Sequence, residues 1–423
     1  MLKLRYNNYL SSLLIFMGYL SIFNKPISGI LKTSAIGYID EVILVIGVIL
    51  ISLIMLLSKK IHVIFLLVAG FFIYSVVISL SFGLNRDWID ILIQSLVNLK
   101  FFLLTLTFLM VFRDRIEVIE RFFRNVLLLA IIGLVLNVIF GSNFNLLFDM
   151  PVYNRPSVAL RYGGFLNPNH LAFLMALYIG TLLSKARTSG SFISAKQWGL
   201  VVGSLFVIAL TDSRTAIIGV FIFFAAFYWE FILKNVKIFM SFLFLIAFSV
   251  VMLLLFSDIL EITLINLQGS FSLDSYYIRG IMINMAVQIS YFYFPIGTGA
   301  ASFGSLLSDG SKVYEDFGVA DRLFFIEKRG IYDSSVASVL GEYGIIGIVL
   351  YGLMFYYLYR YLKTLFPARQ QTMTKALFVA FFFYSVTNPT LTNNIYILIS
   401  IPVFVIFSVS QNKKTITSPQ GLL

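Results

Sequence analysis

Cysteine is absent from this chain of 423 residues, and histidine occurs only twice. The first absence removes disulfides, thiol nucleophiles and thiolate metal sites, and the second leaves little for a histidine zinc site. We therefore expect neither a metal ion nor another cofactor. Charged residues are also scarce, at 12%, whereas hydrophobic residues make up 59%. No water-soluble fold could bury that much apolar surface inside one core.

The net charge of +11 would suggest a nucleic-acid partner in a soluble protein. In a chain this hydrophobic, lysine and arginine first hold cytoplasmic loops in place. We therefore interpret the charge as a sign of membrane topology and expect no nucleic-acid partner.

The hydrophobic residues fall in long runs rather than in short alternating segments. A bilayer core needs roughly 20 apolar residues per helix but only about 10 per barrel strand, so these runs predict helices. The predicted fold class is all-α, a polytopic transmembrane bundle of about twelve spans that forms one membrane domain over residues 1–423. The predicted spans cover residues 9–23, 40–58, 61–82, 89–112, 125–141, 164–184, 198–211, 215–232, 238–256, 336–358, 374–391 and 393–411.

Lysine and arginine are concentrated in alternate connections between these spans. The segment RDRIEVIERFFR at 113–124 and the segment RYLKTLFPARQ at 360–370 are two such connections, predicted to face the cytoplasm. The run at 9–23 lacks a small-residue cleavage site after it, so we interpret it as a retained first span.

A long outer connection separates the ninth and tenth spans. It runs over residues 257–335, whereas most other connections are short, and loops of that length usually have a function or a structure of their own. Its stretch SYYIRGIMINMAVQISYFYF has helical spacing and many aromatics. We expect an amphipathic helix there, resting on the outer leaflet of the extracytoplasmic side.

Ionisable residues are nearly absent inside the spans, and Lys100 is the exception, for which we favour a structural role. Arginines instead lie at the outer ends of distant spans and in the large loop, and we expect them to converge in one outward-facing pocket. Planar guanidinium groups form bidentate hydrogen bonds with phosphate oxygens and keep their charge, so such a cluster suits an anion. These arginines are Arg155, Arg161, Arg214 and Arg279.

Two glycine-containing stretches have different predicted uses. In RYGGFLNPNHLA, Gly163 and Gly164 permit close backbone approach, the NPN turn starts a helix, and Asn169 supplies an amide at the mouth of the sixth span. His170, at the start of that helix, is expected to be structural. The stretch FPIGTGAASFG at 294–304 fails the known phosphate-loop patterns, so we expect a tightly packed re-entry of the outer loop.

Four stretches together resemble the O-antigen ligase and polymerase superfamily over about residues 155–360. They are RYGGFLNPNHLA, LTDSRTAIIGV, Arg279 followed by FPIGTGAASFG, and DSSVASVLGEYGIIG, in that order along the chain. The resemblance implies a metal-independent membrane glycosyltransferase in the plasma (inner) membrane, with its active site on the outer face. Its substrate would be an oligosaccharide linked to undecaprenyl pyrophosphate, and membrane lipid and a chain-length regulator protein would be further partners.

The resemblance also implies roles for individual residues. Arg161, Arg214 and Arg279 would hold the pyrophosphate, and we place Arg155 and Asn169 in the same binding site. Three arginines from distant segments would neutralise the charge that develops on the leaving group.

Two carboxylates are the predicted catalytic residues. Glu342 matches the acidic residue of the family's E-x-G-x-x-G helix, and Asp333 could accept the proton of the acceptor hydroxyl. For Asp333 the structural alternative is a cap for the tenth span. On one continuous helix their spacing would place the two carboxylates on opposite faces.

Ligases of the family carry a His-Asn pair where this chain has Asp333 and Ser334. That departure favours a polymerase, which would transfer a growing polysaccharide onto a lipid-linked repeat unit in O-antigen or capsule synthesis. The alternatives are an O-antigen ligase or another transferase of lipid-linked glycans, and a flippase or exporter of the same lipid-linked sugar. The exporter is disfavoured because the spans offer few polar residues to line a path through the bilayer.

Overall fold

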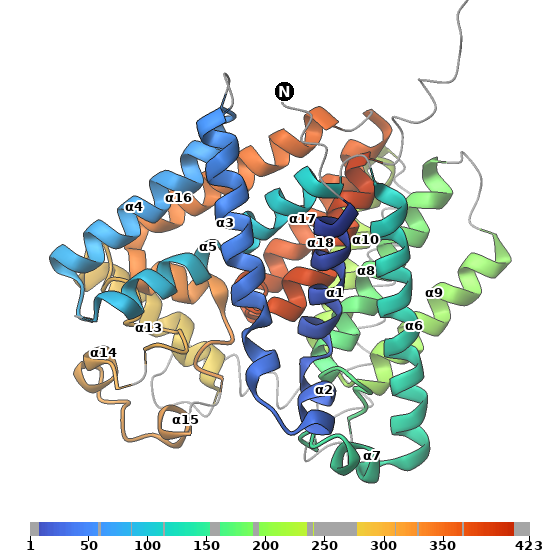
Figure 1. Ribbon diagram of the computed structural model, residues 1–423, viewed down its shortest axis with the longest axis horizontal. Helices are drawn as coiled ribbons and strands as arrows, with labels where there is room; N and C mark the ends of the chain where they lie inside the picture. The colour runs from blue at the N-terminus through green and yellow to red at the C-terminus, as the bar shows by residue number, and fades with distance from the viewer. Residues whose placement is uncertain are drawn as a thin grey trace, which may run out of the picture.

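The computed structural model describes residues 8–57, 61–85, 87–112, 115–152, 161–188, 194–234, 240, 277–308, 310–327, 330–365 and 368–409. Within these ranges the chain is all-α and contains no strand (Figure 1). The helices are α1 (Asn8–Ile22), α2 (Asn24–Leu31), the 3-10 helix η1 (Ala35–Tyr38), α3 (Ile39–Leu57), α4 (Val63–Phe82), α5 (Trp88–Phe112), α6 (Ile116–Phe140), α7 (Ser142–Leu147), α8 (Pro168–Thr188), α9 (Ala195–Leu210), α10 (Arg214–Lys234), α13 (Ile278–Phe292), α14 (Lys312–Asp316), α15 (Leu323–Ile326), α16 (Ser335–Leu365), α17 (Ala368–Thr387) and α18 (Asn394–Val409).

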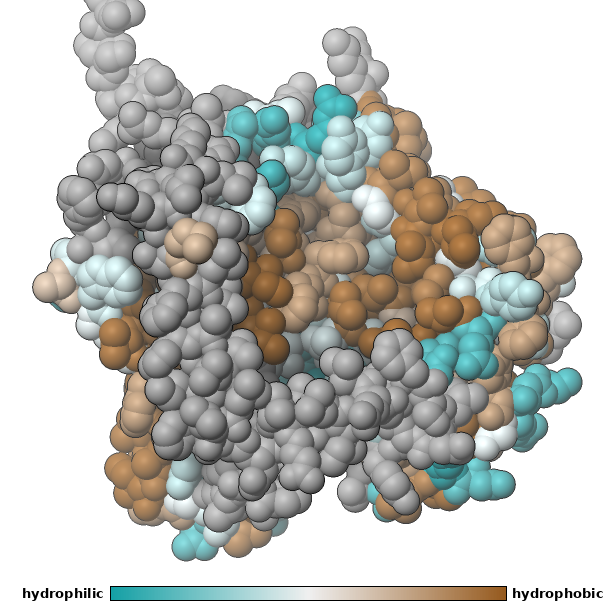
Figure 2. Space-filling view, turned by 180° about the vertical axis from the view of Figure 1, so that it is seen from behind, coloured by the Kyte–Doolittle hydropathy of each residue, from teal (hydrophilic) through white to brown (hydrophobic). Residues whose placement is uncertain are grey.

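Among the described helices, five are long and apolar enough to cross a membrane. They are α3 with η1, α4, α5, α6 and α16, and the pair α1 and α2, bent by 79°, is a sixth candidate. Figure 2 shows the matching surface, with hydrophobic residues gathered on the face seen from behind and polar residues above them and at the lower right. These features indicate a multi-pass membrane protein.

Every predicted span except 238–256 overlaps a helix, and that span, apart from Met240, lies outside the described residues. The predicted number of about twelve spans is not confirmed, because several apolar helices are shorter than a full crossing. The short helices are Pro168–Leu183, Ala195–Leu210, Thr215–Trp229 and Asn394–Ile406.

The prediction that 113–124 is a connection was wrong for most of the segment, because α6 begins at Ile116. Hydropathy falls there, yet the segment continues the helix with one buried face. Phe122 and Phe123 are buried, whereas Arg121 and Arg124 are exposed. A charged stretch can therefore extend a span as an amphipathic helix.

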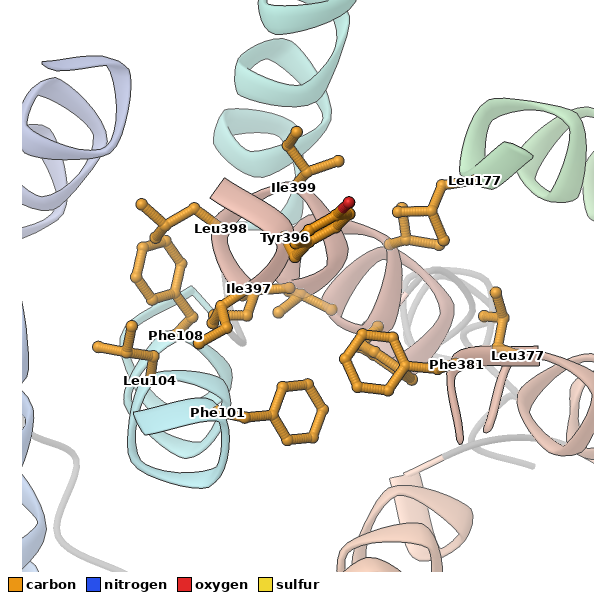
Figure 3. Packing of buried hydrophobic residues seen from close by; sticks show 14 of the residues in the cluster. Phe101, Leu104, Phe108, Leu177, Leu377, Phe381, Tyr396, Ile397, Leu398 and Ile399 are labelled. Carbon is orange, nitrogen blue, oxygen red and sulfur yellow. The ribbon is translucent and has the colours of Figure 1, made fainter. Parts of the chain in front are cut away.

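The helix α18 lies in the middle of the core. It contacts α5, α6, α8 and α17, and Figure 3 shows its residues 396–399 surrounded by side chains of α5, α8 and α17. Phe101 of α5 stacks on Phe381 of α17 with ring centroids 4.7 Å apart, and the Phe404 ring of α18 lies at 5.8 Å from Phe381. The last two predicted spans are therefore central to the packing.

Lys100, in the middle of α5, forms an ion pair with Asp40 at the start of α3. Both side chains are buried, at 3% and 2% exposure. A buried charge requires a partner of opposite sign, so this contact gives Lys100 the structural role that we favoured from the sequence.

The glycine-rich segment 294–304 packs against a break in α16. Gly344 has φ 60° and ψ −157°, a conformation that is not helical. The N–H groups of Thr298 and Gly299 donate to the carbonyls of Gly341 (3.0 Å) and Glu342 (2.7 Å), which the break leaves without helical partners. A Cβ on Gly297 would lie 2.6 Å from the Gly341 oxygen, so the close contact requires glycine. The predicted tight packing of this segment is confirmed.

The helix predicted within the large loop is present as α13. One face of α13 is buried against α16 and the loop, and it includes Met282, Met285 and Ile289. The opposite face exposes Val287 at 54% and Tyr291 at 78%. Apolar residues thus occupy both faces, so the helix is less amphipathic than the sequence predicted.

Candidate active site

The helices α2, α7, α14 and α15 gather at one end of the molecule, the lower end in Figure 1, which we call the loop end. Residues from 161 to 170 enter the bundle here between α7 and α8. Asn137 of α6 holds this entry, since its Oδ1 accepts from the N–H groups of Gly163 and Gly164, both at 3.2 Å. Its Nδ2 donates to Asn145 of α7 at 2.8 Å.

Gly163 and Gly164 allow the chain to pass very close to its neighbours. Gly164 has φ 61°, and a Cβ there would lie 2.4 Å from the backbone nitrogen of Leu134. A Cβ on Gly163 would lie 2.3 Å from the carbonyl oxygen of Leu166. The close backbone approach predicted from these two glycines is therefore confirmed.

The NPN turn starts α8 as the sequence predicted. Pro168 is the first helical residue, where its missing N–H requires no partner. Asn167 precedes it and accepts from the N–H of Asn169 at 2.9 Å. His170 follows in the first turn and is 9% exposed.

Arg161 is buried, with 7% exposure, and its guanidinium joins two segments. Its Nε donates to the carbonyl oxygen of Thr211 at 3.0 Å, and its Nη2 donates to Asn169 Oδ1 at 2.9 Å. Thr211 follows the last residue of α9, where helix carbonyls are unpaired and favour a cation. The structure thus brings Arg161 and Asn169 to the LTDSR turn.

Arg214 is the first residue of α10 and lies three positions after Thr211 in that turn. The start of α10 is therefore near the group that binds Arg161. The side chain of Arg214 is outside the described part of the structure, and so is Arg155, in the segment 153–160. Their predicted roles stay predictions.

Arg279, in the first turn of α13, binds Asp333. Its Nε and Nη2 both donate to Asp333 Oδ2, at 3.1 and 3.0 Å. The two side chains are partly exposed, at 23% and 29%. Burial lowers the pKa of the Arg279 guanidinium, but the Asp333 carboxylate raises it, and the resulting pKa lies above the ordinary value. Arg279 is therefore a fixed cation that an anion can still reach.

Asp333 does not cap the tenth span. The helix α16 begins at Ser335, and Ser334 Oγ accepts from the N–H of Ala337 at 3.1 Å. A serine at this position satisfies one of the unpaired donors of a helix start. Because Asp333 precedes the helix, the expectation of opposite faces on one continuous helix does not apply to it.

A polar hairpin between α17 and α18 meets this helix start. Ser335 Oγ donates to the carbonyl of Asn388 at 3.4 Å and accepts from the N–H of Leu391 at 3.2 Å. Asn388 Oδ1 in turn accepts from the hydroxyl of Tyr396, on α18, at 3.4 Å. The hairpin thereby connects the Arg279 and Asp333 pair to the core helix α18.

Tyr396 also contacts the opposite side of the site. Its ring packs edge-on against His170, with centroids 4.5 Å apart and an interplanar angle of 82°. His170 is adjacent to Asn169, which binds Arg161. Tyr396 therefore contacts His170, which is next to the residue that binds Arg161, and Asn388, which binds the start of α16 beside Asp333.

Sequence reasoning missed Tyr396 and Asn388. The signal that could have found them is the polar run TNPTLTNN at 387–394, between two apolar spans. Such a run usually marks a turn, so its contact with α16 became visible only in the folded chain.

Glu342 lies deeper in the bundle than this group and has no exposed surface. Its Oε2 accepts from Asn98 Nδ2 at 2.8 Å and from Gln94 Nε2 at 3.4 Å, both on α5. The backbone N–H groups of Ala301 and Phe303 also lie near the carboxyl. The hydrogen bonds from Asn98 and Gln94 fix α16 to α5 beside the break at Gly344.

Within the described ranges, no three His, Asp or Glu residues gather in a way that could hold a metal ion. The candidate site consists of arginines, one partly exposed carboxylate, amides and a tyrosine hydroxyl.

Comparison with known families adds one result. Residues 199–352 match the family described as O-Antigen ligase, which is less than half of the chain. The match includes Arg214, Arg279, Asp333 and Glu342, whereas Arg161 lies before it and Tyr396 after it. No curated protein matches the chain. The family match supports a relationship to the superfamily of O-antigen ligases and polymerases, without separating the two activities.

Proposed function

We propose that this protein is a membrane glycosyltransferase that acts on glycans linked to a polyprenyl diphosphate. The observation that carries the proposal is that Arg161 and Arg279, from distant segments, are linked through their binding partners to one tyrosine at the loop end. Fixed guanidinium groups on two sides of a partly buried site suit a diphosphate. The family match over 199–352 supports the same substrate class.

The reaction is a transfer at the anomeric carbon of the donor sugar. An acceptor hydroxyl attacks C1, the bond between C1 and the phosphate oxygen breaks, and the lipid diphosphate leaves with its electron pair. Arg279 and Arg161, with Arg214 as a predicted third member, stabilise the negative charge on the leaving diphosphate. The proton of the acceptor hydroxyl goes to the Asp333 carboxylate.

Asp333 and the donor diphosphate compete for the same guanidinium. Both donated hydrogen bonds of Arg279 go to one carboxylate oxygen, and both side chains are partly exposed. A diphosphate that binds Arg279 would release Asp333, which then becomes a free base beside the donor sugar. Substrate binding and base activation are thereby coupled.

We assign Glu342 a positioning role. Its complete burial and its hydrogen bonds to α5 favour a group that fixes the start of α16, which follows Asp333 directly. It would act on the reaction through the placement of Asp333 rather than by contact with substrate.

Within this class we propose the polymerase reaction, in which the acceptor is another lipid-linked repeat unit on the outer face of the plasma membrane. Asp333 and Ser334 support it, since they stand where ligases of the superfamily carry a His-Asn pair. Ser334 caps α16 here, so this position has a structural use.

The test is product analysis with purified protein in liposomes. The substrate is undecaprenyl-pyrophosphate-linked repeat unit extracted from the producing cells. A ladder of longer lipid-linked chains from this substrate alone supports the polymerase. Product that forms only after addition of a second acceptor identifies a ligase, and movement of a single unit across the bilayer without chain growth identifies an exporter.

A further inference from the structure

We infer that the hydroxyl of Tyr396 is a substrate-binding group of this site, donating a hydrogen bond to the diphosphate between Arg161 and Arg279. This inference rests on the proposed function and extends it to α18. The helix α18 lies outside the family match, and nothing in the sequence resemblance assigns it a role.

Tyr396 has contacts on two sides, and each leads to one of the arginine groups. On one side Tyr396 packs against His170, whose neighbour Asn169 binds Arg161. On the other side its hydroxyl contacts Asn388, which binds the start of α16 beside Asp333. Tyr396 therefore contacts neighbours of both the Arg161 group and the Asp333 group.

The Tyr396 hydroxyl forms only a weak hydrogen bond within the protein. Its bond to Asn388 Oδ1 is 3.4 Å long, whereas good hydroxyl hydrogen bonds measure about 2.7–2.8 Å. Tyr396 is 2% exposed, so the surrounding protein excludes water from this donor. A buried hydroxyl with one long bond can reorient toward a stronger acceptor, and a phosphate oxygen is such an acceptor.

The Tyr396 ring is held in place by two aromatic neighbours. His170 and Phe173 of α8 both pack edge-on against the Tyr396 ring, with centroids at 4.5 and 5.1 Å. These contacts fix the position of the ring and of its oxygen before any substrate arrives, while the O–H bond can still rotate toward an acceptor. A donor held in place by packing loses little entropy when it binds an anion.

Tyr384 of α17 is a matched control. It is also a buried tyrosine that packs against Phe173, with centroids 4.8 Å apart, and its hydroxyl has no hydrogen-bond partner. It lies in the same core and binds Asn388 through its backbone carbonyl, not through its hydroxyl. Removing its hydroxyl should therefore leave anion binding unchanged.

The experiment measures the affinity of farnesyl diphosphate for the full-length protein in nanodiscs. Tyr396→Phe keeps the ring contacts and should weaken binding about tenfold or more, because hydrogen bonds to charged groups are strong. Tyr384→Phe should bind like the wild type, and Arg279→Ala should lose binding. Melting temperatures of all variants check that each is folded.

The affinities of Tyr396→Phe and Arg279→Ala distinguish a failure of the Tyr396 role from a failure of the proposed function. Wild-type affinity in Tyr396→Phe together with loss in Arg279→Ala overturns the role of Tyr396 and keeps the proposed function. Wild-type affinity in both variants overturns the arginine site itself.

A second measurement does not depend on the stability of Tyr396→Phe. A 3-fluorotyrosine introduced at position 396 should show a shifted fluorine resonance when farnesyl diphosphate is added, and the same label at position 384, whose hydroxyl binds nothing among the described residues, should shift less. Equal behaviour of the two labels would overturn the inference.

Discussion

At the scale of single residues, the pair of Arg279 and Asp333 combines two opposite demands. In the proposed mechanism Arg279 must be fixed and charged before substrate arrives, and Asp333 holds it through two hydrogen bonds to one oxygen. Asp333 can act as a base only after it leaves that pair. Under this proposal the same contact prepares the anion site and restrains the base, and two substitutions separate these effects.

Replacing Arg279 with lysine keeps the charge but loses the planar pair of donors. We expect Arg279→Lys to lower kcat/KM for chain growth about a hundredfold or more, with normal protein levels in the membrane. Rates with purified lipid-linked repeat unit check this, and Arg322→Lys, in the same outer loop, is the control. Full activity of Arg279→Lys would remove the role of its guanidinium in binding diphosphate.

Replacing Asp333 with asparagine removes the base and also frees Arg279. We expect Asp333→Asn to lower kcat about a hundredfold or more, while KM for the lipid-linked donor stays the same or falls. Steady-state kinetics measures both constants, with exposed Asp321→Asn as the control. A rise in KM without a change in kcat would show that Asp333 binds substrate instead.

The sequence predicted Arg161, Arg279 and Asp333 as site residues because charges at the ends of apolar runs stand out. It did not reveal that Arg279 and Asp333 bind each other, since 54 positions separate them along the chain. It missed Tyr396 because a tyrosine near the end of an apolar helix has no distinguishing pattern. Such contacts depend on how the helices pack, which local patterns do not determine.

At the scale of elements, the break in α16 separates the turns beside the site from the rest of the span. The segment 294–304 fills the break, and Gly344 approaches Pro295 so closely that a Cβ would lie 2.4 Å from its carbonyl oxygen. Glu342 binds α5 on the same side of the break as Asp333. The first turns of α16 are thus held by the loop and by α5 together.

Gly344→Ala should therefore destabilise the protein by about 2 kcal/mol or more, because φ 60° with ψ −157° is open almost only to glycine. Thermal unfolding in detergent, compared with wild type, measures the effect. Gly352→Ala in the same helix is the control, since nothing lies within 4 Å of its added Cβ, and it should not destabilise. Equal stability of both variants would contradict the account of the break.

Hydropathy located the helices well but not their ends. Charged turns extend α6 at its start, and α16 continues to Leu365, beyond the predicted end at 358, because a helix can leave the bilayer without breaking. The pattern also gave no sign of the break at Gly344, since glycine is common in membrane helices that do not break. Long apolar runs therefore predict where a span lies, whereas its ends and breaks depend on packing.

At the scale of the whole molecule, the ion pair of Lys100 and Asp40 joins α5 to α3 in the buried interior. Lys100→Met would leave a buried carboxylate unpaired, so we expect a loss of about 3–5 kcal/mol in unfolding free energy. The double variant with Asp40→Leu should regain most of that loss. Denaturation in detergent measures both, and a double variant as unstable as the single one would contradict this view.

The orientation of the bundle can be tested directly because the chain has no cysteine. We expect Leu306→Cys, on the outer loop, to react with a membrane-impermeant maleimide in intact spheroplasts. Leu306 is 71% exposed. Lys363→Cys, near the other end of α16, should react only after the membrane is opened. The reverse pattern would place the loop end in the cytoplasm.

The hairpin at 388–393 has a practical consequence for engineering. Asn388 binds the start of α16, yet this hairpin and α18 follow the family match, which ends at 352. A chimera that transplants only residues 199–352 into a distant relative would carry Arg279 and Asp333 of the loop. Its hairpin and its last helix, including the position of Tyr396, would still come from the relative. Exchange of specificity between such enzymes should therefore require the C-terminal helices to travel with the outer loop.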